Sequence, residues 1–152
     1  MNAEEALSDL HAVADPSRRP GMSRIGINVE RALGASVPHI RKIARRCGTD
    51  QTVAEALWDS RIHEARILAT LIADPRALDP GTRERWAADI DSWDVCDFAA
   101  DLFCDTNGAD RLIRTWARRS EPYVKRCAFS MIARQAVPRR PGRIPASNAR
   151  FP

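Results

Sequence analysis

Two side chains that could do chemistry together, Trp93 and Asp97, lie one turn apart in a segment with helical periodicity. At about 100° per residue, both point almost directly away from the apolar stripe of this segment. An indole face attracts cations and a carboxylate neutralises them, so the pair could stabilise a positively charged group. The pattern predicts a solvent-facing site on this helix. The apolar stripe runs through Val95, Phe98, Ala99, Leu102 and Phe103.

Each member of the pair also has an ordinary structural explanation. Trp93 could pack against an adjacent part of the fold, and Asp97 could form a salt bridge with Arg66 or Arg126. Exposed charges on neighbouring helices commonly pair in this way. On these residues alone, both interpretations stay open.

Other kinds of active site lack their required residues. His63-Glu64 resembles the start of the zinc-binding pattern H-E-x-x-H, but Ile67 occupies the position of the second histidine. The three histidines have no spacing that would form a metal cluster. The chain also has no glycine-rich phosphate loop, no G-x-S-x-G and no Cys-His arrangement. We therefore expect neither a metal nor a cofactor.

The elements that must position these side chains are helices, because strand-like alternation is nearly absent. Ser36 and Pro38 lie where a helix cap and first turn belong, and Gly48 supplies the end of that helix. The short connections favour antiparallel neighbours. Helices are expected near residues 3–14, 36–47, 51–59, 61–73, 80–90, 93–104, 109–118 and 122–136.

Tryptophans mark an internal repeat. Trp58, Trp86 and Trp116 are 28 and 30 residues apart, and each lies on the first helix of a pair. When the sequences of the second helices of the three pairs are aligned, three charged residues fall at the same position. These residues should form a row along one concave surface. The sequence therefore predicts an all-α superhelix of HEAT-like antiparallel helix pairs, with about seven or eight helices. The coinciding residues are Arg66, Asp97 and Arg126.

Charge is distributed unevenly along the chain. Residues 67–105 hold nine acidic residues against three arginines, whereas residues 106–152 hold eleven basic residues against two acidic ones. Basic ends around an acidic middle suit a protein that grips a phosphate backbone at its edges. An arginine bias from a GC-rich genome would explain the same count, since 22 of the 24 basic residues are arginine.

Length and apolar content indicate one folded domain that is neither secreted nor embedded in a membrane. The acidic N-terminal segment has no apolar core of signal-peptide length, and no stretch reaches the length of a membrane span. We expect a cytoplasmic, nucleoid-associated protein. In that reducing compartment the four cysteines, which form no C-x-x-C pair, should remain thiols.

Four segments resemble, in order and spacing, the DNA alkylation repair family of AlkD-like glycosylases. They are LGASVPHIRKIAR (33–45), LWDSRIHEARILATLIADP (57–75), DIDSWDVCDFAADLF (89–103) and YVKRCAFSMIARQAV (123–137). The resemblance covers roughly residues 24–137. It implies a HEAT-like superhelix that cups duplex DNA and excises cationic N3- and N7-alkylpurines as a monofunctional glycosylase.

The resemblance also implies roles for individual residues. The family's catalytic carboxylate matches Asp97, its aromatic neighbour matches Trp93, and its DNA-contacting arginine matches Arg126. A cationic purine leaves without a general acid, so one carboxylate is enough to stabilise the sugar cation and orient water. Further side chains expected to contact DNA are Arg66, Lys125, Ser130, Arg134, Arg41, Lys42 and Arg45.

The C-terminal end departs from the family pattern. A second family tryptophan has no counterpart, because Val137 is followed by PRRPGRIPASNARFP. We expect residues 1–137 to form a partial HEAT-like domain without its C-terminal repeats, and residues 138–152 to form a Pro- and Arg-rich tail without fixed structure. The last helix should then expose a face, and the protein should be a monomer unless a partner covers that end. Two alternatives to a glycosylase are a non-catalytic module that binds nucleic acid or protein, and an inactive truncated paralogue.

Overall fold

The computed structural model describes residues 1–138, and this part of the chain folds into nine α-helices and one 3-10 turn, with no strand. The all-α prediction is confirmed. Apart from Pro138, the predicted tail lies outside the described residues. None of the helices in residues 1–138 is long and apolar enough to cross a membrane. The elements are α1 (Ala3–Ala12), η1 (Pro16–Arg18), α2 (Arg19–Arg24), α3 (Val37–Cys47), α4 (Gln51–Asp59), α5 (His63–Ile72), α6 (Pro80–Asp89), α7 (Trp93–Phe103), α8 (Ala109–Trp116) and α9 (Pro122–Gln135).

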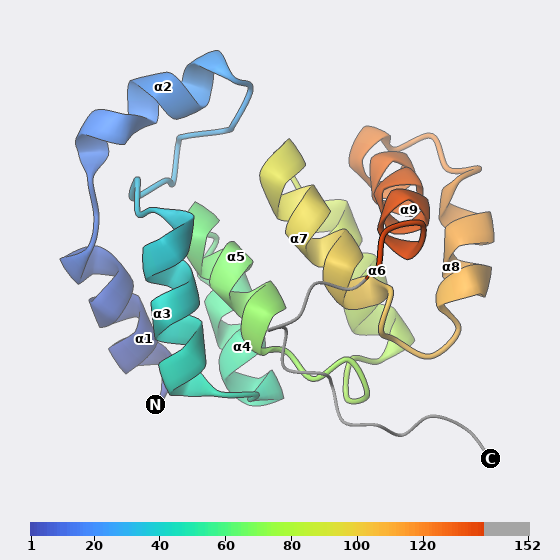
Figure 1. Ribbon diagram of the computed structural model, residues 1–152, viewed down its shortest axis with the longest axis horizontal. Helices are drawn as coiled ribbons and strands as arrows, with labels where there is room; N and C mark the ends of the chain where they lie inside the picture. The colour runs from blue at the N-terminus through green and yellow to red at the C-terminus, as the bar shows by residue number, and fades with distance from the viewer. Residues whose placement is uncertain (139–152) are drawn as a thin grey trace.

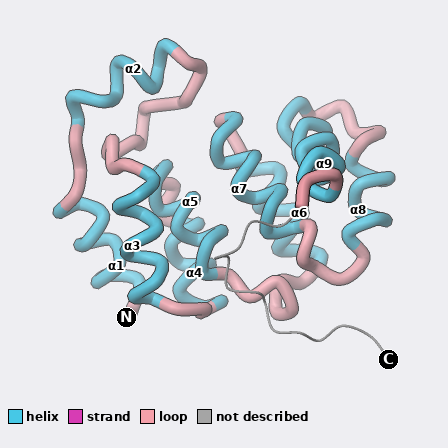
Figure 2. The backbone as a smooth tube through the Cα atoms, viewed as in Figure 1, coloured by secondary structure: helices cyan, strands magenta, loops and turns pink. Residues whose placement is uncertain are grey.

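The helices form two layers. The inner layer contains α3, α5, α7 and α9, each packed on the next, so that they follow one another across the molecule in chain order (Figure 1). The outer layer contains α1, α4, α6 and α8, of which α4 packs on α5, α6 on α7 and α9, and α8 on α9. Loops make the connections, as Figure 2 shows. This arrangement is the predicted stack of helix pairs.

The three repeating tryptophans form the interior of the stack. Trp58, Trp86 and Trp116 are fully buried, one on each of α4, α6 and α8. The rings of Trp58 and Trp86 stack at 4.3 Å with an angle of 2° between their planes. Trp116 meets the edge of Phe103 from α7 at 5.4 Å. Large aromatic rings at a fixed period thus join each helix pair to its neighbours.

Local signals explain where the helices begin and end. Asp50 and Asp79 cap α4 and α6 by accepting hydrogen bonds from the backbone N–H groups of the first turns. Gly48 ends α3 with a φ of +68°. Ser36 occupies the expected cap position of α3, but its hydroxyl bonds to the His39 ring instead of the backbone.

Residues 13–36, which we call the N-terminal arm, include a helix that was not predicted from the sequence. The arm contains η1 and α2 and arches away from α3 before returning to it (Figure 1). Its return is held by Arg19, which donates to the Val29 carbonyl at 2.7 Å, and by Arg18, which donates to the Gly34 carbonyl at 3.0 Å. The segment RPGMSR of α2 buries none of its residues, so it has no apolar stripe to detect.

Gly34 is where the arm packs most tightly. Its φ is +81°, and a Cβ there would lie 2.0 Å from the Asp15 carbonyl oxygen. Gly26 has a φ of +83° but nothing within 4 Å of such a Cβ.

We expect Gly26→Ala to lower the free energy of unfolding by about 1–2 kcal/mol, the usual cost of a left-handed alanine. Gly34→Ala should cost clearly more, because the Asp15 backbone must also move. Urea unfolding of both variants measures the difference, and equal losses would contradict this account.

Candidate nucleic-acid interface

Asp97 lies on the inner layer, where α7 meets α9. Its carboxylate accepts a hydrogen bond from the Ser130 hydroxyl at 3.2 Å and lies 3.6 Å from the Arg126 guanidinium. The side chains of Asp97 and Arg126 are both 46% exposed. Of the alternatives left open by the sequence, the salt bridge to Arg126 is therefore present. The carboxylate is oriented by two α9 side chains while it remains accessible to solvent.

Trp93, the first residue of α7, lies at the edge of the same surface and is partly exposed. Its indole N–H donates to the Ile25 carbonyl of the N-terminal arm at 2.9 Å. The prediction that Trp93 and Asp97 avoid the buried stripe is confirmed, since Val95 and Ala99 are fully buried. The contact with the arm was missed, because residues 68 positions away carry no spacing signal.

Phe98 corrects one detail of the predicted stripe. Instead of being buried with its neighbours, its ring is partly exposed and lies 5.7 Å from the Arg41 guanidinium of α3. This cation–π contact joins α3 to α7 across the inner layer. Arg41 thus contacts the residue that follows Asp97 in the sequence. The remaining exposed basic residues expected at this surface are Lys42, Arg45 and Lys125.

Arg66 does not lie beside Asp97 in the exposed row that the repeat predicted. It is 7% exposed, and its guanidinium lies over the Trp58 ring at 5.2 Å. It donates to the Asp89 carbonyl at 2.9 Å and lies 3.9 Å from the Asp91 carboxylate. Burial lowers the pKa of Arg66 from its usual value, and these acidic neighbours partly oppose that effect. Arg66 therefore holds the turn between α6 and α7.

One face of α9 pairs with α7 along its length. Arg126 and Ser130 contact Asp97, and one turn later the Arg134 Nε and Nη2 atoms donate to Asp101 at 2.8 and 2.7 Å. The predicted common face of Arg126, Ser130 and Arg134 is therefore confirmed. The acidic partner Asp101 was missed, although it lies one turn beyond Asp97.

Two thiols lie next to these α7–α9 side-chain pairs in the sequence. Cys96 and Cys127 are fully buried, next to Asp97 and Arg126 in the sequence. A hydrogen bond with Cys96, together with burial, raises the pKa of Cys127 far above its usual value. Cys127 is therefore a protonated thiol at neutral pH.

His63 and Glu64 fasten the arm to the inner layer. The buried Glu64 carboxylate accepts the backbone N–H groups of Leu33 and Gly34, both at 2.8 Å. The His63 ring bonds to Asp94 of α7 at 2.8 Å. The residues that resembled a zinc motif therefore act as structural partners.

The His63–Asp94 pair shifts both titrations. Burial favours neutral His63, but the hydrogen bond and charge of Asp94 outweigh it and raise the pKa of His63. Burial likewise favours neutral Asp94, but the hydrogen bond and charge of His63 outweigh it and lower the pKa of Asp94. The charged pair is thus favoured in the folded protein.

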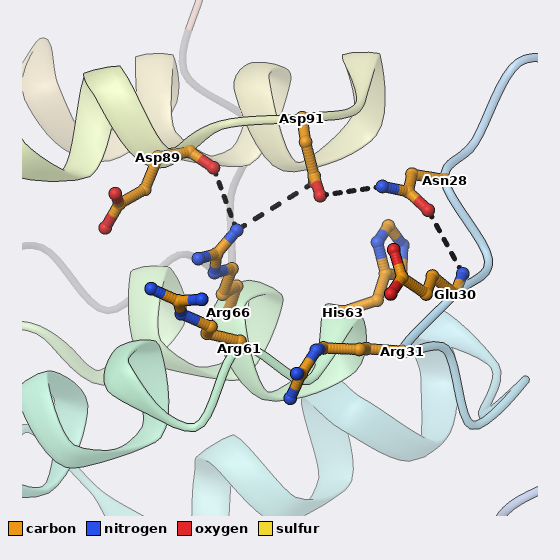
Figure 3. A pocket seen from close by; sticks show the side chains of 8 residues that line it. All are labelled: Asn28, Glu30, Arg31, Arg61, His63, Arg66, Asp89 and Asp91. Atoms are coloured by element: carbon orange, nitrogen blue, oxygen red, sulfur yellow. Dashed lines mark hydrogen bonds and ion pairs between the residues drawn. The ribbon is translucent and has the colours of Figure 1, made fainter.

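A polar pocket of about 310 Å³ lies beside this pair, between the arm and the turns that precede α5 and α7. Figure 3 shows its three arginines along one side, with Asp91 and Asn28 opposite them. No spacing in the sequence predicts this pocket, because it joins three segments distant in the chain. Its lining residues are Asn28, Glu30, Arg31, Arg61, His63, Arg66, Asp89 and Asp91.

Comparison with known proteins places this stack of helices in a class. A family model described as "DNA alkylation repair enzyme" matches residues 6–144, which is nearly the whole chain. The chain therefore belongs to the DNA alkylation repair enzyme family, as the sequence segments indicated. The match begins earlier and ends later than residues 24–137, which carry the resemblance in the sequence. No curated protein sequence matches the chain.

A solved structure confirms the fold. It comes from a family of proteins related to the HEAT-like repeat DNA glycosylases and described as having affinity for branched DNA structures. The TM-score is 0.79 at 20% sequence identity, over 87% of this chain. The matched region is 56% of the other protein, so this chain spans little more than half of its length.

The His63–Asp94 pair predicts a pH-dependent stability. The folded pKa of His63 is raised, so its contribution is complete below about pH 6.5 and is lost as the pH rises through the folded value. The folded pKa of Asp94 is lowered, so its contribution is complete above about pH 4 and is lost as the pH falls. Asp94→Asn should therefore destabilise most between about pH 4 and 6.5, by about 1–3 kcal/mol.

Urea unfolding at a series of pH values tests this window. Asp110→Asn, on the surface of α8, is the control and should cost little at any pH, because its partner is the neutral Gln135 amide, from which the asparagine oxygen can also accept a hydrogen bond. A loss for Asp94→Asn that is independent of pH would show that the pair is not charged in the folded protein.

Proposed function

We propose that this chain excises cationic N3- and N7-alkylpurines from duplex DNA as a monofunctional glycosylase. The observation that carries the proposal is the half-exposed Asp97 carboxylate, held by Arg126 and Ser130 one turn from Trp93. Membership of the DNA alkylation repair enzyme family supports it. The exposed basic side chains of α3 and Lys125 of α9 supply attraction for a DNA backbone.

The chemistry needs only one carboxylate. An alkylated purine already carries a positive charge, so the electron pair of the breaking glycosidic bond neutralises it and the base leaves without protonation. The sugar is left with oxocarbenium character, which the Asp97 carboxylate stabilises. Water then attacks C1′ and gives its proton to Asp97 or to solvent. The products are the free neutral base and an abasic site.

Trp93 and Arg126 serve as positioning groups in this proposal. The indole face of Trp93 attracts a cationic base more strongly than a neutral one, which favours the alkylated purine. Its N–H bond to Ile25 fixes the edge of the ring and leaves its faces as the contact surface. Arg126 can exchange Asp97 for a phosphate that flanks the lesion.

Release of 7-methylguanine from methylated duplex DNA tests the proposal. Asp97→Asn removes the charge but keeps the size of the side chain, and we expect release to fall by at least about 100-fold while DNA binding persists. Asp101→Asn is the matched control, because Asp101 lies one turn further along α7 and pairs with Arg134. Equal release by the wild type and Asp97→Asn, or none from either, overturns the proposal.

A second candidate function is DNA binding without excision. The Asp97–Arg126 ion pair favours it, because it occupies the carboxylate that catalysis needs. So does the likeness to a protein from a family with affinity for branched DNA. This candidate predicts tighter binding to a four-way junction than to a linear duplex at equal salt, and the same preference for the junction in Asp97→Asn. Fluorescence anisotropy with both DNAs measures this, and equal affinities would argue against it.

A further inference from the structure

The polar pocket beside His63 contains carboxylates that are already paired. Asp91 accepts a hydrogen bond from Asn28 at 3.0 Å and lies 3.9 Å from Arg66. Asp89 accepts the Trp58 indole N–H at 3.1 Å. Both charges therefore have donors within the protein. Glu30, on the arm, is the third carboxylate of the lining.

The arginines of the pocket are not equally engaged. Arg66 is 7% exposed and uses its guanidinium on the turn between α6 and α7. Arg31 and Arg61 are exposed, and within residues 1–138 the side chain of neither forms an ion pair or a hydrogen bond. Two guanidinium groups therefore face a polar cavity with their donors unused.

The backbones of these two arginines are held in place. The Arg31 carbonyl accepts the N–H of the buried His63 at 3.1 Å. Arg61 has a φ of +61°, and no other non-glycine residue within 1–138 has a positive φ. Its N–H donates to the Trp58 carbonyl at 3.2 Å. A non-glycine residue in the left-handed region costs conformational energy, and such residues cluster at binding and active sites.

We propose that Arg31 and Arg61 form a phosphate-binding site for the DNA backbone, outside the surface that carries Asp97. A guanidinium group presents a planar fork of donors that matches two phosphate oxygens, and two such groups can bind one phosphate from both sides. His63 of the pocket lining bonds to Asp94 of α7, and Asp91 of the lining lies two residues before Trp93, so the pocket is connected to the start of α7. The site rests on the proposed binding of DNA and extends it to the edge formed by the arm.

The salt dependence of DNA binding by the full chain tests the site. Each lost phosphate contact lowers the slope of log affinity against log salt by about 0.9 on duplex DNA. We expect this decrease, about 0.9, for the double variant Arg31→Gln/Arg61→Gln, and part of it for each single variant, because the two groups bind one phosphate together. Arg31→Lys keeps the charge and should keep the slope. Arg114→Gln is the matched control, an exposed arginine on the outer helix α8, and should leave the slope unchanged.

Glu30 gives an independent reading. Glu30→Gln removes a negative charge from the pocket lining, so DNA affinity should rise about 2- to 4-fold if a phosphate binds there. If the double arginine variant still binds DNA and its affinity has the wild-type dependence on salt, the proposed site is wrong. That result leaves the glycosylase proposal intact, because 7-methylguanine release by the wild type and Asp97→Asn tests it separately. Absence of any DNA affinity in the wild type overturns both.

Discussion

One buried carboxylate, Glu64, carries the connection between the helical stack and the N-terminal arm. Burial of a carboxyl group is costly unless its oxygens receive hydrogen bonds, and here two backbone N–H groups of the arm supply them. The next contacts follow from that anchor. The backbone N–H of the neighbouring His63 donates to the Arg31 carbonyl of the arm, and the His63 ring bonds to Asp94 of α7. The arm then lies where Ile25 can accept the Trp93 indole N–H.

The sequence predicted the stack well because its determinants are local. Apolar stripes, caps and short connections define most of the helices, and the tryptophan period reflects the interior that joins the layers. The arm escaped prediction for the opposite reason. Its helix α2 buries no side chain and is held by arginines that donate to backbone carbonyls. Such bonds depend on where the chain returns, which no periodic pattern encodes.

The sequence predicted which way the side chains of α7 and α9 point, but it did not predict all of the groups that they contact. The helical angle placed Trp93 and Asp97 off the stripe, and the face of α9 followed from the same geometry. The alignment that coupled Arg66 with Asp97 failed, because equivalent positions in a degenerate repeat can face different neighbours. Arg66 meets Trp58 and the turn before α7, whereas Asp97 meets α9.

One face of α9 is exposed, as the repeat pattern predicts for the last helix. Phe129 and Ile132 of α9 are 54% and 44% exposed, whereas Cys127 and Met131 on its other side are fully buried. A helix inside a stack of pairs buries faces on both neighbours, and α9 has such contacts only with α6, α7 and α8 among the described helices. The side-chain pairs with α7 orient Arg126, Ser130 and Arg134 on the polar face of α9.

The Asp97–Arg126 pair determines how this surface can respond to nucleic acid. Both side chains are 46% exposed, and exposed ion pairs contribute only about 0–1 kcal/mol. A backbone phosphate offers Arg126 a charge-assisted partner of greater strength. In the proposed mechanism, exchange of Asp97 for phosphate therefore costs little, and it leaves the carboxylate oriented by Ser130 with its negative charge uncompensated. Binding of a DNA phosphate to Arg126 therefore exposes the Asp97 charge to a cationic base in the same step.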